Sequence, residues 1–116
     1  MRDEGLLRWQ WRHYPDGHCD RRNLAIHLAT QPLFVAGVAA LVAAPLTGML
    51  WLLGAGPAAM VIAIALQGRG HRLEATRPLP FEGPLDVVAR LFVEQLITFP
   101  RFVLSGALAR AWRAAR

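Results

Sequence analysis

The longest feature of the hydrophobic pattern is an apolar run between Arg22 and Arg69, 46 residues without Asp, Glu, Lys or Arg. As a helix, this run reaches roughly 69 Å, enough to cross a hydrocarbon core of about 30 Å twice. A turn over 45–48 divides it into two helices of adequate length, expected over 24–44 and 49–67. A turn over 54–57 leaves a second helix too short to cross. The pattern therefore predicts an all-α membrane protein built on a transmembrane helical hairpin (23–68).

The segment before this hairpin, residues 1–22, mixes aromatic and basic side chains. Such a mixture is typical of chain lying at the level of the lipid headgroups. A Pro-Asp-Gly turn follows at 15–17, and Asn23 is expected to cap the first apolar helix. The first thirty residues lack an apolar stretch of the length that a signal peptide needs, so we expect no cleaved leader.

After the hairpin, residues 69–84 form a polar, proline-rich connector, and Pro84 suits the first turn of a last helix. From Leu85 the apolar positions recur at helical spacing. Asp86, Arg90 and Glu94 are spaced by four and predict a solvated, charge-paired stripe. Pro100 is expected to break the helix. Residues 85–116 are therefore interpreted as an amphipathic interfacial or re-entrant helix, with a third span as the alternative, and the whole chain (1–116) as one integral membrane domain.

The net charge of +5 comes from thirteen arginines against eight acids. Nucleic-acid binding is not expected, because the arginines gather at the ends of apolar segments, where they suit membrane lipids. Arginines flank both ends of the hairpin, so the positive-inside rule places both ends in the cytoplasm. We expect an integral protein of a bacterial-type inner membrane.

Four histidines lie near the predicted membrane boundary: His13, His18, His27 and His71. Because a hairpin returns to the side it left, His27 and His71 can meet in space, with His18 on the same side. Neutral imidazoles with one carboxylate suit Fe(II), Mn or Zn, and open coordination positions favour an iron oxygenase. The single Cys19 argues against a thiolate-rich site. The alternative interpretation is that these histidines are aromatic rings at the headgroup level without a ligand.

Two strings resemble the signatures of a small membrane family. The first runs from Tyr14 to His27, Y-P-D-G-H-C-D-R-R-N-L-A-I-H, and is followed by Pro32. The second consists of Gln67, Gly70, His71, Glu74, Arg77 and Pro78. Over 12–32 and 64–80 the chain resembles the iron-dependent 2-hydroxy fatty acid dioxygenases that metabolise phytosphingosine to odd-numbered fatty acids. It looks like a reduced, bacterial-type member of that family.

This resemblance implies Fe(II) held by His18, His27 and His71, with Glu74 as a fourth ligand or as the partner of a histidine. It implies O₂ as the oxidant and a 2-hydroxy fatty acid, shortened by one carbon, as the lipid substrate. Asn23 would cap the helix or orient His18, and Tyr14 is a candidate hydrogen-bond donor near the oxidant. Candidate partners of the substrate carboxylate are four arginines: Arg22, Arg69, Arg72 and Arg77.

Two other classes of function remain open from the sequence. One is a non-enzymatic membrane scaffold or lipid-binding protein, in which the histidines are incidental. Small residues along the two apolar helices could then support a homo-oligomer, although their default use is packing within the hairpin. The other is a zinc-dependent membrane hydrolase with the same histidines. The metal content separates these hypotheses, because a scaffold has no reason to bind stoichiometric iron.

Overall fold

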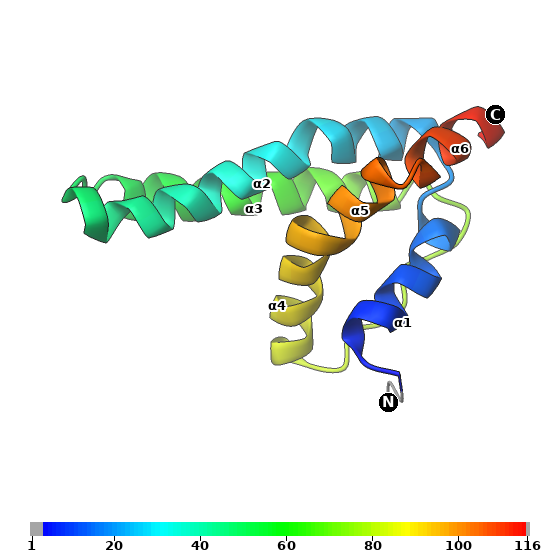
Figure 1. Ribbon diagram of the computed structural model, residues 1–116, viewed down its shortest axis with the longest axis horizontal. Helices are drawn as coiled ribbons and strands as arrows, with labels where there is room; N and C mark the ends of the chain where they lie inside the picture. The colour runs from blue at the N-terminus through cyan, green and yellow to red at the C-terminus, as the bar shows by residue number, and fades with distance from the viewer. Residues whose placement is uncertain (1–3, 116) are drawn as a thin grey trace.

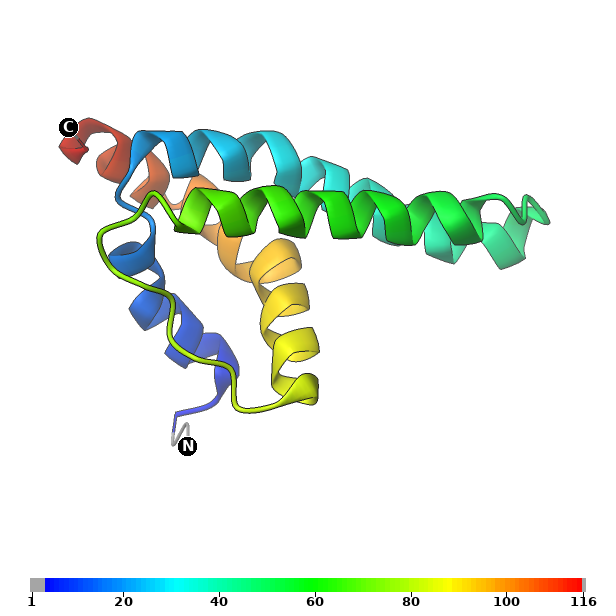
Figure 2. The same ribbon diagram turned by 180° about the vertical axis from the view of Figure 1, so that it is seen from behind.

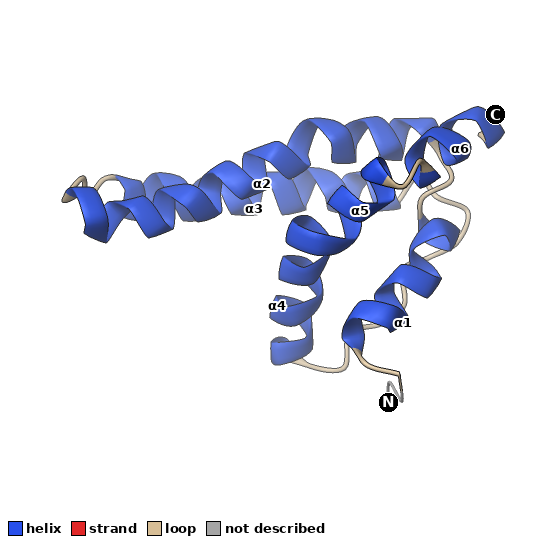
Figure 3. Cartoon of the chain, viewed as in Figure 1, coloured by secondary structure: helices blue, strands red, loops and turns tan. Residues whose placement is uncertain are grey.

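A computed structural model describes residues 4–115, and this part of the chain contains helices and no strand. The elements follow in the order α1 (Leu6–His13), η1 (Tyr14–Gly17), α2 (Arg21–Thr47), α3 (Leu52–His71), α4 (Pro84–Val93), η2 (Glu94–Thr98), α5 (Phe99–Leu104) and α6 (Ala107–Ala114). Figure 3 shows this all-helical arrangement.

The two long helices form the predicted hairpin. α2 has 27 residues and α3 has 20, they run antiparallel side by side, and both are long and apolar enough to cross a membrane (Figures 1 and 2). α2 continues through Pro45 to Thr47 and ends at Gly48, whose left-handed backbone (φ 72°) lets its N–H bond to the carbonyl of Ala44. The prediction of the hairpin is confirmed, with a first helix longer at both ends than expected.

The N-terminal end of α2 differs from the prediction. The helix begins at Arg21, and Asp20 caps it by accepting a 2.8 Å hydrogen bond from the Arg22 N–H. Asn23, expected to cap the helix, lies inside its first turn and is fully buried. The local preference of Asn for a cap is thus overridden, because Asp20 supplies a cap three residues earlier and Asn23 has buried partners.

Two glycines allow the hairpin helices to approach closely. A Cβ added at Gly37 would lie 2.6 Å from the carbonyl oxygen of Gly56, and one added at Gly56 would lie 2.7 Å from the carbonyl of Gly37. Backbone therefore packs on backbone at this level, as small residues permit in apolar helix pairs. These small residues serve packing within the hairpin.

The remaining helices lie beside one end of the hairpin. α4 runs transverse to the hairpin, α1 lies next to it, and α5 and α6 turn back along α2 (Figures 1 and 2). Pro100, expected to break the helix, instead lies inside α5, because the π-helical turn η2 precedes it and widens the backbone there. The actual break comes later, at Gly106, which has φ 85°.

A chain of buried amide side chains fastens η2 to the hairpin. Gln67 and Gln95 exchange hydrogen bonds of 3.0 and 2.6 Å, and Gln67 also donates to the hydroxyl of Thr30. Gln31 donates to the Gln95 carbonyl at 2.8 Å. Buried polar groups are costly unless they are paired, so these bonds fix the position of η2 on α2 and α3.

Candidate metal centre

Four side chains from four separate parts of the chain converge where the hairpin meets η2. His18 lies between η1 and α2, His27 on α2, His71 at the end of α3 and Glu94 at the start of η2, and their ligand atoms all lie within 4.8 Å of one another. The three imidazole rings are mutually edge-on, with centroids 4.8 to 5.0 Å apart. This grouping is on the scale set by metal–ligand bonds of about 2.0–2.2 Å.

Hydrogen bonds to the backbone orient two of the rings. His18 Nδ1 lies 2.7 Å from the Tyr14 carbonyl, and His27 Nδ1 lies 3.0 Å from the Asn23 carbonyl. A carbonyl only accepts, so each Nδ1 donates to it, which leaves each Nε2 beside the Glu94 carboxylate. Metal-binding histidines are commonly held in this way, with one ring nitrogen donating to a carbonyl and the other facing the ion.

Three ring nitrogens of the cluster have no hydrogen-bond partner among the described residues. They are Nε2 of His18, Nε2 of His27 and Nδ1 of His71, and all three are buried. Buried polar atoms normally find a partner, so three unpaired nitrogens that face one another and a carboxylate need an explanation. A divalent cation that binds neutral imidazole would satisfy all three, and the donor set fits such an ion.

Glu94 supplies the acidic group of the cluster. Its Oε2 lies 3.6 Å from His18 Nε2 and 3.5 Å from His27 Nε2, which is longer than a hydrogen bond. Burial opposes the charge of this carboxylate, but the two histidines outweigh burial and hold the pKa of Glu94 well below its usual range. The predicted solvated stripe is thus wrong at Glu94, whose side chain is only 12% exposed.

Tyr14 connects the N-terminal segment to this acid. Its hydroxyl donates a 2.8 Å hydrogen bond to Glu94 Oε2, and its ring stacks on His18 with centroids 3.8 Å apart. Burial, and then the neighbouring Glu94 carboxylate, raise the pKa of Tyr14 well above its ordinary value. Tyr14 is therefore a neutral hydroxyl donor that positions both Glu94 and His18.

Glu74, expected as a ligand or as the partner of a histidine, lies outside the cluster. Its carboxylate accepts hydrogen bonds from the N–H groups of Cys19 and Asp20 and from Asn23 Nδ2, the last at 2.7 Å. These bonds tie the connector after α3 to the start of α2. Asn23 Nδ2 also donates to the Gly17 carbonyl at 3.3 Å, so Glu74 and Asn23 together fix the backbone before and after His18.

A cleft of about 1130 Å³ opens next to the cluster, and His18, His71, Tyr14 and Glu94 line one part of it. Two of the four candidate arginines, Arg72 and Arg77, line the cleft, as does His13. Its apolar wall comes from α3, α4, α1 and the connector, through Ile64, Leu91, Trp9, Leu79 and Phe81.

The other two candidate arginines are not brought to this cleft. Arg22 is paired with Asp20 at 2.9 Å on the surface, and Arg69 is exposed on α3. His13, the histidine left without a role, packs at a tilt against Trp9 with centroids 5.1 Å apart and is not part of the cluster. The structure thus brings together His18, His27 and His71, places Arg72 and Arg77 nearby, and adds Glu94.

Glu94 is the site residue that sequence reasoning missed. Its spacing from Asp86 and Arg90 matched a solvated helix face, and only the pairing of α4 with α1 turns that face inward.

Neither protein-family models, nor curated proteins, nor solved structures gave a match to this chain.

Proposed function

We propose that this chain is a membrane-bound, non-haem Fe(II) dioxygenase that shortens 2-hydroxy fatty acids by one carbon. The observation that carries the proposal is the set of three unpartnered histidine nitrogens facing the Glu94 carboxylate at the edge of a large cleft. The resemblance of 12–32 and 64–80 to dioxygenases of this type supports the same chemistry. The uncharged hairpin supports an integral membrane protein, and the arginines at both of its ends favour a cytoplasmic position for those ends.

His18, His27, His71 and Glu94 would hold the metal. When bound, Fe(II) supplies the electrons that triplet O₂ needs in order to react with a closed-shell acid. The overall conversion balances when one 2-hydroxy acid and one O₂ give the acid one carbon shorter, CO₂ and water, with four electrons passing to O₂. A set of histidines and one carboxylate is a donor set that would suit a non-haem iron able to bind further ligands.

The chain's own residues would bind and orient the substrate. Arg72 and Arg77 offer guanidinium groups for the substrate carboxylate, which they can bind with two parallel hydrogen bonds. The acyl chain would lie along the apolar wall of the cleft, beside Ile64 and Leu91. Tyr14 would keep Glu94 ionised and fixed in direction by its hydrogen bond, and burial of the histidines would exclude bulk water.

Metal content tests the proposal first. The protein is purified in detergent without O₂ and with Fe(II) supplied, and bound iron, zinc and manganese are measured per chain. We expect near one iron per wild-type chain and its loss in His27→Ala, whereas His13→Ala, the matched control that lines the same cleft outside the cluster, keeps its iron. Stoichiometric zinc would point to a hydrolase, and no metal in any variant would leave the scaffold hypothesis.

The iron-loaded protein is then given 2-hydroxy fatty acids and O₂. We expect a fatty acid one carbon shorter by mass spectrometry and one O₂ consumed per product. The Arg77→Ala variant should bind iron normally and show a higher KM. Iron binding without any chain shortening would contradict the assigned reaction.

A further inference from the structure

The distal half of the hairpin extends beyond every other described element, as Figures 1 and 2 both show. The α4–η2 segment contacts α2 at Gln31, which donates to the Gln95 carbonyl, and at Phe34, whose ring packs edge-on against Phe92. Beyond this level α2 and α3 pack on each other alone.

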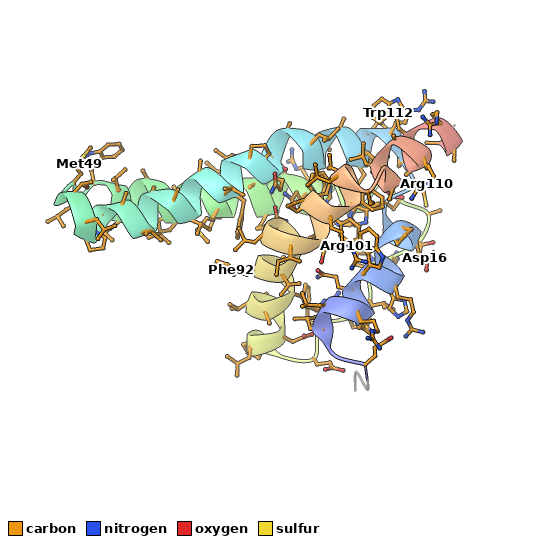
Figure 4. The ribbon with its side chains drawn as sticks, viewed as in Figure 1. Asp16, Met49, Phe92, Arg101, Arg110 and Trp112 are labelled. Atoms are coloured by element: carbon orange, nitrogen blue, oxygen red, sulfur yellow. The ribbon has the colours of Figure 1, made fainter. Side chains whose placement is uncertain are left out.

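At the level of Gln31 and Phe34, α4 lies transverse to the hairpin, and it has one apolar and one charged face. Its apolar stripe comprises Leu85, Val88 and Phe92, and Leu96 of η2 continues it. The other face carries Asp86 and Arg90, continued by Glu94 of η2, and lies against α1 and the cleft, where Gln10 donates to the Arg90 carbonyl. In Figure 4, Phe92 lies on the side of α4 that faces the hairpin tip, which Met49 marks. Asp16, Arg101 and Arg110 lie on the other side of α4.

The α4 stripe and the distal hairpin make one apolar surface. Exposed side chains on it include Leu85 at 86%, Val88 at 54%, Leu46 at 79%, Leu50 at 69% and Val61 at 67%. The sequence holds no charged residue between Arg22 and Arg69, so none interrupts the hairpin part. Apolar patches of this extent on a protein mark a membrane or protein contact. An amphipathic helix such as α4, lying across the base of a protruding apolar hairpin, fits the planar surface of a lipid bilayer.

We propose that α4 lies flat in one surface of a lipid bilayer with its stripe among the acyl chains, and that the hairpin enters the bilayer only from Gln31 and Gln67 outward. Thr47 lies sixteen positions after Gln31. These positions span roughly 24 Å at a rise of about 1.5 Å per residue, against a hydrocarbon core of about 30 Å. The helices have the length to cross, but α4 holds back the part that carries the histidines. The tip therefore ends inside the bilayer, and the His18–His27–His71–Glu94 cluster lies at the headgroup level of the near surface.

This seating explains why polar and apolar elements divide at one plane. α1, the connector and the cationic groups near the cleft, including Arg72 and Arg77, fall on the water side of α4, where anionic headgroups favour arginine. This position in the bilayer does not depend on what the histidines bind. The experiments below can therefore reject it while the metal site is supported, and the metal site can be rejected while this position is supported.

A single thiol moved along the chain tests the depth of the tip. The wild type has one cysteine, the exposed Cys19. The Cys19→Ser/Thr47→Cys protein has its only thiol at the tip, and Cys19→Ser/Ala75→Cys has it on the exposed connector. Each is reconstituted into vesicles of phosphatidylcholine and phosphatidylglycerol, with a membrane-impermeant maleimide introduced on both sides by freeze–thaw. We expect labelling at positions 19 and 75, and labelling at 47 only after detergent; equal labelling at 47 in intact vesicles would show that the tip reaches the far surface.

Two neighbouring positions that point in different directions from α4 test its orientation, and these variants leave the hairpin packing untouched. An environment-sensitive fluorophore is attached at Val88→Cys, on the stripe, or at Val87→Cys, on the cleft side, both with Cys19→Ser. Phospholipids with a spin label near the headgroup should quench the fluorophore at 88 several-fold more than the one at 87. Equal quenching at the two positions, or quenching at 88 only by a label deep in the acyl chains, would overturn the flat seating of α4.

Discussion

The Tyr14 hydroxyl donates a 2.8 Å hydrogen bond to the Glu94 carboxylate across 80 positions of sequence. The same ring stacks on His18, so one residue of the N-terminal turn positions two members of the cluster. The effect of Tyr14 on a bound ion would pass through the two side chains that it holds.

Removal of this hydroxyl should weaken metal binding without abolishing it. Tyr14→Phe keeps the ring on His18 and loses only the bond to Glu94. Loss of such a supporting hydrogen bond typically lowers metal affinity by about 10- to 100-fold. The check is a competition titration with a chelator. Phe102→Leu, which alters an edge-on neighbour of the Tyr14 ring and no polar group, should change the affinity far less.

The two buried glutamates should separate by their effects. Glu94→Gln removes the charge that faces the histidines, so we expect loss of most bound metal while the helical content is kept. Glu74→Gln should instead retain the metal site and lower the free energy of unfolding by about 1–3 kcal/mol, because it loses charge-assisted bonds from backbone N–H groups. Metal analysis and denaturant unfolding of both variants make the comparison. Metal loss in Glu74→Gln alone would reverse the assignment.

Adding a methyl group should lower the stability of the hairpin at Gly37 but not at Gly54. Gly37→Ala puts a methyl group against the Gly56 carbonyl, and overpacking of this kind costs about 1–3 kcal/mol. Gly54→Ala has no atom within 4 Å of the added Cβ and should be neutral or slightly stabilising, since Ala favours a helix over Gly. Thermal unfolding in detergent should rank the variants accordingly. Equal stability of the two would show that the helices pack less closely at Gly37.

The Gln67–Gln95 pair should behave non-additively. Gln67→Met leaves the buried Gln95 amide without its partner, which costs about 1–3 kcal/mol, and Gln95→Met does the same to Gln67. The double variant loses both polar groups and should cost less than the sum of the two single changes. A double-mutant cycle by chemical unfolding measures the difference. Strict additivity would mean that the two amides do not stabilise each other.

The hairpin could be predicted because an uncharged run of 46 residues has few alternatives, whatever its exact ends. The helix start was misplaced because Asp20 and Asn23 are both good caps, and only burial of Asn23 against Glu74 decides between them. The proximity of His27 to His71 could be predicted, because the second helix of a hairpin returns to the side on which the first began. The position of Glu94 could not be predicted. It depends on the packing of α4 against α1 and on the π-helical turn that begins at Glu94, and the local sequence pattern signals neither.

The four side chains of the cluster come from both sides of the hairpin, and 76 positions separate His18 from Glu94. During synthesis the hairpin is complete at His71, well before Glu94 leaves the ribosome. A nascent chain at that stage can present three imidazoles without their acid, which is an incomplete and weakly selective site. If the cluster holds an ion as proposed, loading would therefore be a late step in biogenesis, because the complete set of four side chains exists only after α4 and η2 have been made.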